Sequence, residues 1–155
     1  RFAGSIPESV CTMVSVKSVN MGQNLIHGEV PECVYRMPYL SNFGAEVGRL
    51  EGTIANNIGR SRIRDLDLSK NSLEGSIPWS IGELLGLTSF FLADNKFKGS
   101  LPGKMSRCEN LVIFEVSMND FTGPLPWGNY SELFFYGATR NRFEGTLPML
   151  VGSLE

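Results

Sequence analysis

The chain has 155 residues, a formal net charge of -2, 42% hydrophobic residues and 19% charged residues. This length supports one domain with its own core, and the near-neutral charge excludes a basic surface that would hold nucleic acid or anionic lipid. No apolar run approaches the ~20 residues of a membrane span, and three cysteines with one histidine leave little for metal, cofactor or nucleophile chemistry.

One short segment recurs seven times along the chain. It reads apolar, any residue, Gly, any residue, apolar and usually Pro, and it starts with Phe2-Ala3-Gly4-Ser5-Ile6-Pro7. The repeated glycines are Gly4, Gly28, Gly52, Gly75, Gly99, Gly123 and Gly145, with spacings of 24, 24, 23, 24, 24 and 22 residues. Such a constant period predicts a repeat architecture in which each copy forms one coil.

A second element keeps the same phase. Four residues before the repeated glycine stands an asparagine in five copies, and Gly48 takes this place in a sixth; the asparagines are Asn24, Asn71, Asn95, Asn119 and Asn141. An asparagine side chain can bond to backbone groups of its own coil and of the next one, so stacked copies would form a ladder inside the solenoid. We refer below to this place in each copy as the Asn position.

Apolar and polar residues alternate before each Asn position, which is typical of a short half-buried strand. The clearest copy runs from Ile63 to Asn71. Between the proline and the next strand, stretches such as Trp79 to Leu87 predict a helical or 3₁₀ turn that supplies apolar residues to the core. One coil cannot bury its own apolar face, but a stack of about six coils can.

Two places depart from the repeat. The copy with Gly48 and Ala55 lacks both the asparagine and the proline, so we expect local irregularity there. The spacings of 23 and 22 residues indicate one deletion near Arg60 and two between Pro126 and Leu133. Residues 126–129 are therefore expected to form a bend on the convex surface.

The pattern resembles the plant-type extracellular leucine-rich repeat, because residues 61–82 match its repeat, LxxLxxLxLxxNxLxGxIPxxLGxL, almost position for position. The most specific part of this repeat is its LxGxIP tail. The resemblance covers essentially the whole chain. It implies a right-handed solenoid with a parallel β-sheet on the concave face, 3₁₀ turns on the convex face and few helices. Residues 1–155 would form a single domain of about six 24-residue repeats.

The ends of the chain lack the cysteine-bearing caps that usually seal this family. The chain opens inside a repeat at Arg1, without a signal-peptide pattern, and closes inside another at residues 151–154. Uncapped solenoid ends would expose core residues. We therefore expect a fragment of a longer solenoid, or a domain that packs against something at both ends.

The cysteines suggest structural rather than chemical roles. Cys108 occupies a place that other copies fill with Met or Leu, so it should be buried and inert. Cys11 and Cys33 flank equivalent apolar positions in neighbouring coils, so a disulfide between them could form. We nevertheless expect two free thiols, and the odd number of cysteines says little about the compartment.

Three other features are open to a functional interpretation. The lone histidine, His27, lies beside Gly28 and fits an exposed turn residue better than a catalytic base. Asn129-Tyr130-Ser131 is the sole N-x-S/T sequon and lies in a predicted turn, which suits N-glycosylation of a secreted protein. Asp65 and Asp67 could in principle act as acid and base, but Arg64 and Lys70 nearby favour an ordinary solvated charged strip.

The concave face is the expected binding surface. Outward-facing strand residues in three successive copies include Phe91, Ile113 and Phe135, which could form one exposed apolar ridge flanked by Asp67 and Glu115. Contiguous exposed apolar patches tend to mark interfaces.

Arg140 and Arg142 flank Asn141. Family members that bind peptide carboxylates often carry two arginines on this face. Here only the end of the strand is near, which makes that role the weaker prediction.

From the resemblance, the implied function is non-enzymatic recognition by the ligand-sensing ectodomain of a receptor-like kinase or receptor-like protein, outside the cell or at its surface. The partner would be a protein or peptide ligand or a co-receptor ectodomain, with no nucleic acid and no cofactor. A preformed sheet would lose little ordering entropy on binding. Two alternatives stay open: an inhibitor of a secreted cell-wall hydrolase, as polygalacturonase-inhibiting proteins share this repeat, and a structural spacer inside a longer solenoid.

Overall fold

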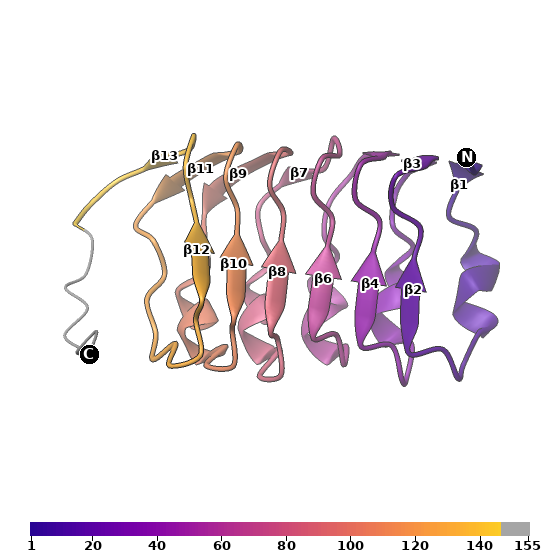
Figure 1. Ribbon diagram of the computed structural model, residues 1–155, viewed down its shortest axis with the longest axis horizontal. Helices are drawn as coiled ribbons and strands as arrows, with labels where there is room; N and C mark the ends of the chain where they lie inside the picture. Colours follow the sequence, from indigo (N-terminus) through magenta and orange to yellow (C-terminus); the bar gives the residue numbers. More distant parts are fainter. Residues whose placement is uncertain (147–155) are drawn as a thin grey trace.

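The computed structural model describes residues 1–146, in which successive coils stack side by side into an elongated solenoid (Figure 1). One side carries a six-stranded parallel sheet in the order β12-β10-β8-β6-β4-β2, which we call the concave sheet. Its strands are β2 (Ser18–Asn20), β4 (Asn42–Gly44), β6 (Asp65–Asp67), β8 (Ser89–Phe91), β10 (Ile113–Glu115) and β12 (Phe135–Gly137). The predicted parallel sheet is confirmed, since each coil pairs with the coil before and the coil after it.

Each concave strand is three residues long for a local reason. Its middle residue faces the core, as Leu66 and Phe90 do, while the outer two face away. A few residues further on, just before the Asn position, the backbone turns into the left-handed region at Gln23, Val47, Lys70, Asp94, Met118 and Arg140. This turn leads the chain out of the concave sheet in every coil.

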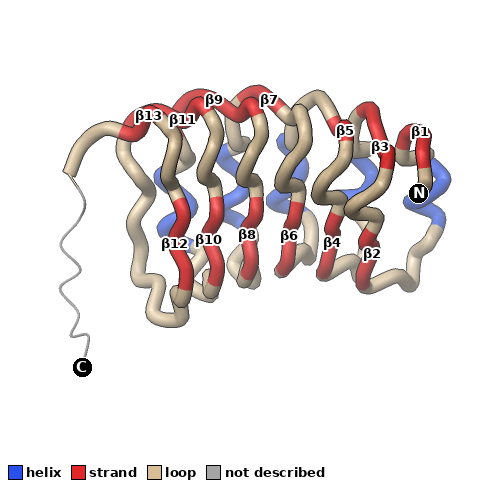
Figure 2. The backbone as a smooth tube through the Cα atoms, turned by 45° about the horizontal axis from the view of Figure 1, so that its top comes forward, coloured by secondary structure: helices blue, strands red, loops and turns tan. Residues whose placement is uncertain are grey.

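A second row of parallel strands follows the Asn positions along the upper edge of the solenoid (Figure 2). It consists of a three-stranded sheet of β1 (Ala3–Ser5), β3 (Leu25–Gly28) and β5 (Arg49–Leu50), and a four-stranded sheet of β7 (Glu74–Gly75), β9 (Lys96–Ser100), β11 (Asp120–Gly123) and β13 (Arg142–Phe143). The sequence predicted turns here, and that prediction was wrong. The repeated glycines have φ between 70° and 112°, yet most of them lie within these strands and pair in register with the adjacent coil.

The two upper sheets meet between β5 and β7, where the Ser72 amide still donates to the Leu50 carbonyl at 2.8 Å and the Glu74 amide to the Gly52 carbonyl at 2.8 Å. This is the copy in which Gly48 replaces the asparagine and Ala55 replaces the proline. The backbone pairing thus continues through this copy, and the departure from the repeat is the asparagine missing at Gly48.

Five 3₁₀ helices cover the side opposite the concave sheet (Figure 2). They are η1 (Glu8–Thr12), η2 (Glu32–Arg36), η3 (Asn56–Arg60), η4 (Trp79–Glu83) and η5 (Gly103–Arg107), and no α-helix occurs among residues 1–146. Each follows an N-cap residue, usually proline, with extended ψ. The coil shortened between Pro126 and Leu133 has no such helix, and there the Tyr130 hydroxyl donates to the Met105 carbonyl at 3.0 Å.

Two aromatic stacks run along the solenoid inside its C-terminal half. Phe114 lies with its ring centroid 5.9 Å from Phe90 and 4.6 Å from Tyr136, and Trp127 continues this stack 5.1 Å from Tyr136. Phe121 stacks in the same way at 6.1 Å from Phe97 and at 6.0 Å from Phe143. Offset aromatic pairs contribute about 0.5–1.5 kcal/mol each beyond the area they bury, so these rows link coil to coil.

The repeated asparagines bind backbone groups of two coils. Asn95 Oδ1 accepts from the Leu73 amide at 3.0 Å, and Asn95 Nδ2 donates to the carbonyls of Leu68 at 2.9 Å and Leu92 at 3.0 Å. Asn71, Asn119 and Asn141 repeat this arrangement. The second coil is the preceding one, whereas the sequence suggested the next. The ladder lacks a rung at Gly48.

Replacement of Val47 by asparagine should stabilise the protein. Val47 is the only β-branched residue among the six non-glycine residues with positive φ in the described part of the chain, with φ of 55°. Left-handed backbone costs an ordinary residue roughly 1–2 kcal/mol, and asparagine tolerates it best after glycine. Since Val47 is 44% exposed, we expect Val47→Asn to raise the free energy of unfolding in urea by about 1 kcal/mol.

The matched control is Met118→Asn, at the same place in another coil, with φ of 58° and 41% exposure. Methionine is unbranched at Cβ, so this change should gain less. An equal gain at both positions would show that the branched side chain of Val47 is not the source of the strain.

Candidate functional site

The outward side chains of the concave sheet lie in two rows set by the strand register. The first row, six residues before the Asn position, contains Ser18, Asn42, Asp65, Ser89, Ile113 and Phe135. The second row, four residues before it, contains Asn20, Gly44, Asp67, Phe91, Glu115 and Gly137. Neither row contains lysine or arginine, so the face combines apolar and acidic groups.

The three apolar side chains of the predicted ridge lie on neighbouring strands but in two different rows. Ile113 lies directly opposite Phe135, but its other neighbour is Ser89 in the first row. Phe91 belongs to the second row, where it lies between Asp67 and Glu115. The ridge is thus an Ile113–Phe135 pair with Phe91 diagonal to it, roughly 7–8 Å away. Phe135 is 46% exposed, and the other two are half-buried.

The carboxylates of this face differ in how many of their oxygens already accept a hydrogen bond. Asp65 accepts from Asn42 Nδ2 at 2.5 Å and from Thr88 Oγ1 at 2.8 Å, one bond at each oxygen. Asp67 accepts through Oδ1 alone, from the Ser69 amide at 3.0 Å. The two aspartates share no hydrogen bond between them, which does not support the acid–base pairing considered from the sequence.

A shallow hollow of about 250 Å³ lies on the concave sheet over strands β2 to β8. Its polar lining comes from Ser18, Asn20, Asn42, Asp65, Asp67 and Ser89. Phe91 borders it on one side, and Gly44 leaves the second row without a side chain between Asn20 and Asp67. The volume is below the roughly 300–1,000 Å³ of small-molecule sites, so it suits one side chain rather than a cofactor.

Comparisons with known proteins bear on this arrangement. The family described as Leucine Rich Repeat matches residues 62–84. Among curated proteins, Receptor-like protein CLAVATA2 of Arabidopsis thaliana is 32% identical over 65 residues, or 42% of this chain and 9% of that protein. This chain therefore spans less than a tenth of that relative's length.

Solved structures cover more of the chain. The Arabidopsis receptor kinase HAESA, in complex with the peptide hormone IDA and the co-receptor SERK1, superposes with a TM-score of 0.91 at 27% identity, over 95% of this chain and 25% of that one. A chain of the BIR3–SERK2 complex from Arabidopsis thaliana is 31% identical with a TM-score of 0.62, over 75% of this chain and 67% of that one.

The chain belongs to the leucine-rich repeat proteins. Its relatives are plant receptor-like proteins and receptor ectodomains, a group that is typically non-catalytic. The predicted solenoid fold is confirmed by these superpositions. Within residues 1–146, no helix has the length and apolarity to cross a membrane.

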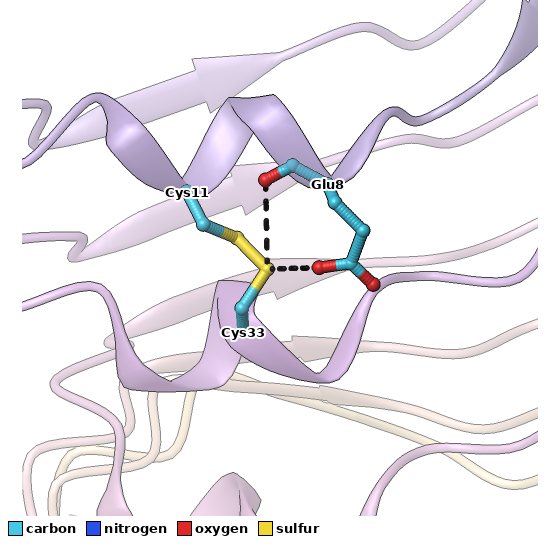
Figure 3. A group of neighbouring side chains, drawn as sticks. All are labelled: Glu8, Cys11 and Cys33. Carbon is cyan, nitrogen blue, oxygen red and sulfur yellow. Dashed lines mark hydrogen bonds between the residues drawn. A yellow bond between two sulfur atoms is a disulfide. The ribbon is translucent and has the colours of Figure 1, made fainter.

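The leucine-rich repeat coils are cross-linked at the N-terminal end, where Cys11 of η1 and Cys33 of η2 form a disulfide with a Cα–Cα distance of 5.9 Å (Figure 3). The possible Cys11–Cys33 disulfide is therefore confirmed, and the expectation of two free thiols is wrong. The fourth residue of one 3₁₀ helix lies over the second residue of the next, which brings these two side chains together. Glu8 Oε2 contacts Cys33 Sγ at 3.1 Å.

The Glu8, Cys11 and Cys33 side chains are also the only described group with metal-ligand spacing. Metal ligation by cysteine requires a thiolate, and both sulfurs are held in the disulfide. A disulfide sulfur carries no proton either, so the approach of Glu8 in Figure 3 is a contact without a donated hydrogen. The group is thus a covalent link between coils.

The remaining predicted residues lie away from the concave hollow. His27 is exposed, in strand β3 rather than a turn. Cys108 is fully buried, where desolvation raises its thiol pKa to about 11 and keeps it protonated and unreactive. Asn129 is exposed in the loop before β12. Arg142 lies in the upper sheet, where it pairs with Asp120 at 2.8 Å, and is not part of the concave sheet.

Two outward-facing strand residues, Asn42 and Gly44, were not among the predicted site residues. Asn42 lies beside Asp65 and orients it, and Gly44 opens the hollow. Both occupy outward positions of the alternating pattern, so their place in the two rows was a usable signal. The roles of Asn42 and Gly44 depend on which residues lie opposite them in the neighbouring strands. These opposite residues are found by counting back from the Asn position in each copy.

Proposed function

We propose that this segment is part of the extracellular ligand-binding solenoid of a plant receptor-like protein or receptor-like kinase, and that its concave sheet recognises an extended peptide or protein segment without catalysis. The Ile113–Phe135 pair, in which Phe135 is exposed and Ile113 is half-buried, carries this proposal, because apolar side chains on neighbouring strands of an unpartnered sheet tend to mark an interface. Relatives solved with a bound peptide hormone support it, and the Cys11–Cys33 disulfide fits an oxidising compartment.

Removal of the apolar pair should weaken peptide binding while leaving the fold intact. The probe is a pool of random linear peptides selected on the wild-type chain. The variant is Ile113→Ala with Phe135→Ala, and binding of the selected peptides should fall at least about tenfold in titration. Both side chains are partly exposed, so the thermal midpoint should change little.

The matched control is Trp79→Ala on the convex side, which removes a larger side chain that is 57% exposed. It should leave binding unchanged. If the selected peptides bind the double variant as they bind wild type, or if Trp79→Ala weakens them equally, the concave face is not the recognition surface. A spacer segment would select no peptides at all.

Asn129 should carry an N-linked glycan when the chain is secreted from plant or insect cells. Its side chain is exposed and its turn is held by the Tyr130 hydroxyl, which donates to Met105 O at 3.0 Å. Digestion with an amidase specific for N-glycans should increase gel mobility of the wild type and not of Asn129→Gln. An unchanged mobility of the wild-type chain after digestion would show that Asn129 is not modified.

A further inference from the structure

We propose that the hollow over Gly44 binds a basic side chain of the recognised peptide, arginine in preference to lysine, and that the Ile113–Phe135 pair binds an apolar side chain of the same peptide. This inference rests on the proposed function, since it names the chemistry of the ligand that the concave sheet takes. It follows from the shape of the hollow, the sign of its charge and the one carboxylate oxygen left free in it.

The shape comes from glycines in the second row. Gly44 leaves an opening between Asn20 and Asp67, with Phe91 on the far side. The Glu46 carboxylate lies against Gly22 in the space that a Cβ would fill, with its Oε2 3.5 Å from the Cβ position of Gly44, and the Glu115 carboxylate lies in the same way against Gly137. The acidic side chains are thus folded down over neighbouring strands, and the hollow stays open to a side chain from outside.

The charge of the face has one sign. The outward positions six, four and two residues before the Asn positions include the carboxylates of Glu46, Asp65, Asp67 and Glu115 and no lysine or arginine. The whole chain has a net charge of only -2, so the acidic character is concentrated on this face. Such a surface attracts cationic partners and repels acidic ones.

Asp67 provides the free acceptor. Both oxygens of Asp65 already accept hydrogen bonds, from Asn42 and Thr88, whereas Oδ2 of Asp67 has no partner among the described residues. Asp67 pairs in register with Phe91 of the adjacent strand, and adjacent strands lie ~4.8 Å apart. A cation bound to Asp67 therefore lies within reach of the Phe91 ring. A guanidinium group can bond to the carboxylate and stack on the ring together, which an ammonium does less well.

The spacing to the apolar pair sets the ligand pattern. Asp67 lies in β6, and the pair lies in β10 and β12, two and three strands further along the sheet. At ~4.8 Å per strand this is roughly 10–14 Å, which an extended peptide at ~3.3 Å per residue covers in about three or four residues. The ligand should therefore carry an apolar residue three or four positions from its arginine.

The test uses capped linear peptides of Gly and Ser with two fixed positions. One position is Arg, Lys, Gln or Glu, and the other, three or four residues away, is Phe or Ser. Peptides with Arg and Phe should bind the wild-type chain at least about tenfold more tightly than those with Gln and Phe. Asp67→Asn, which keeps an acceptor for the Ser69 amide, should remove most of this preference for Arg and leave binding of the Gln peptides unchanged.

The matched control is Glu109→Gln, which removes the same charge at an exposed turn outside the concave sheet and should leave the preference intact. If Gln and Arg peptides bind equally, or if Asp67→Asn keeps the preference, the basic side chain is not recognised here. If the peptides still require Phe and lose binding with Phe135→Ala, the proposed function survives that failure. If no peptide binds, or no concave variant alters binding, the proposed function fails as well.

Discussion

Replacement of Asn119 by alanine should destabilise the chain by roughly 3 kcal/mol, because it leaves buried backbone groups of two coils without partners. Asn119 is 8% exposed. Its Oδ1 accepts from the Phe97 amide at 3.0 Å, and its Nδ2 donates to the Leu92 carbonyl at 3.0 Å and to the Val116 carbonyl at 3.1 Å. An alanine methyl replaces none of these bonds and leaves no path for water to reach them.

The measurement is urea denaturation followed by circular dichroism, with Asn110→Ala as the matched control. Asn110 is also an asparagine that bonds to the preceding coil, through Nδ2 to the Leu85 carbonyl at 2.7 Å, but it is exposed. Water can replace that bond, so the control should lose no more than about 1 kcal/mol. Similar losses for the two variants would mean that the asparagine ladder does not stabilise the stack.

The positions of the concave strands and of their buried residues could be predicted, because they depend on the local alternation of apolar and polar residues. Residues such as Leu66 and Phe90 are apolar between polar neighbours, and a strand of period two buries them wherever the coil stacks. The upper sheet could not be predicted in the same way. Positive φ at residues such as Gly75 looks like the end of a strand, but Gly75 itself pairs in register with Phe97 of β9.

The apolar ridge depends on the register between neighbouring strands. Phe91 is four residues before its Asn position and Ile113 is six before its own, so the two rows could be distinguished from the sequence. Register is what separates a continuous ridge from a pair beside an aromatic ring between Asp67 and Glu115, and these two surfaces favour different ligands.

The disulfide depended on information that the sequence does not hold. Cys11 is the fourth residue of η1 and Cys33 is the second of η2. Spacing within the repeat does not say that these two places meet, because the offset between stacked coils is a property of the packing. The same offset places Gly59 against Ser80 and Gly82 against Lys104, so a covalent link in one pair of coils corresponds to close backbone contact in others.

Replacement of Gly82 by alanine should therefore be among the most damaging single changes, at roughly 3 kcal/mol. A Cβ at Gly82 would lie 2.6 Å from both the carbonyl carbon and the Cβ of Lys104. Backbone atoms of the next coil cannot turn away as a side chain end can. The coils of η4 and η5 must separate, and this exposes the apolar residues packed between them, such as Ile81 and Met105.

Gly103→Ala is the matched control, because a Cβ there would meet nothing within 4 Å. It should change the free energy of unfolding by no more than about 0.5 kcal/mol. Since each coil contacts only its neighbours, a strained interface in the middle of the stack should also weaken the cooperativity between the two halves. The urea m-value of Gly82→Ala should then fall below that of Gly103→Ala. Equal midpoints and equal m-values for the two variants would show that close approach at this point does not hold the stack together.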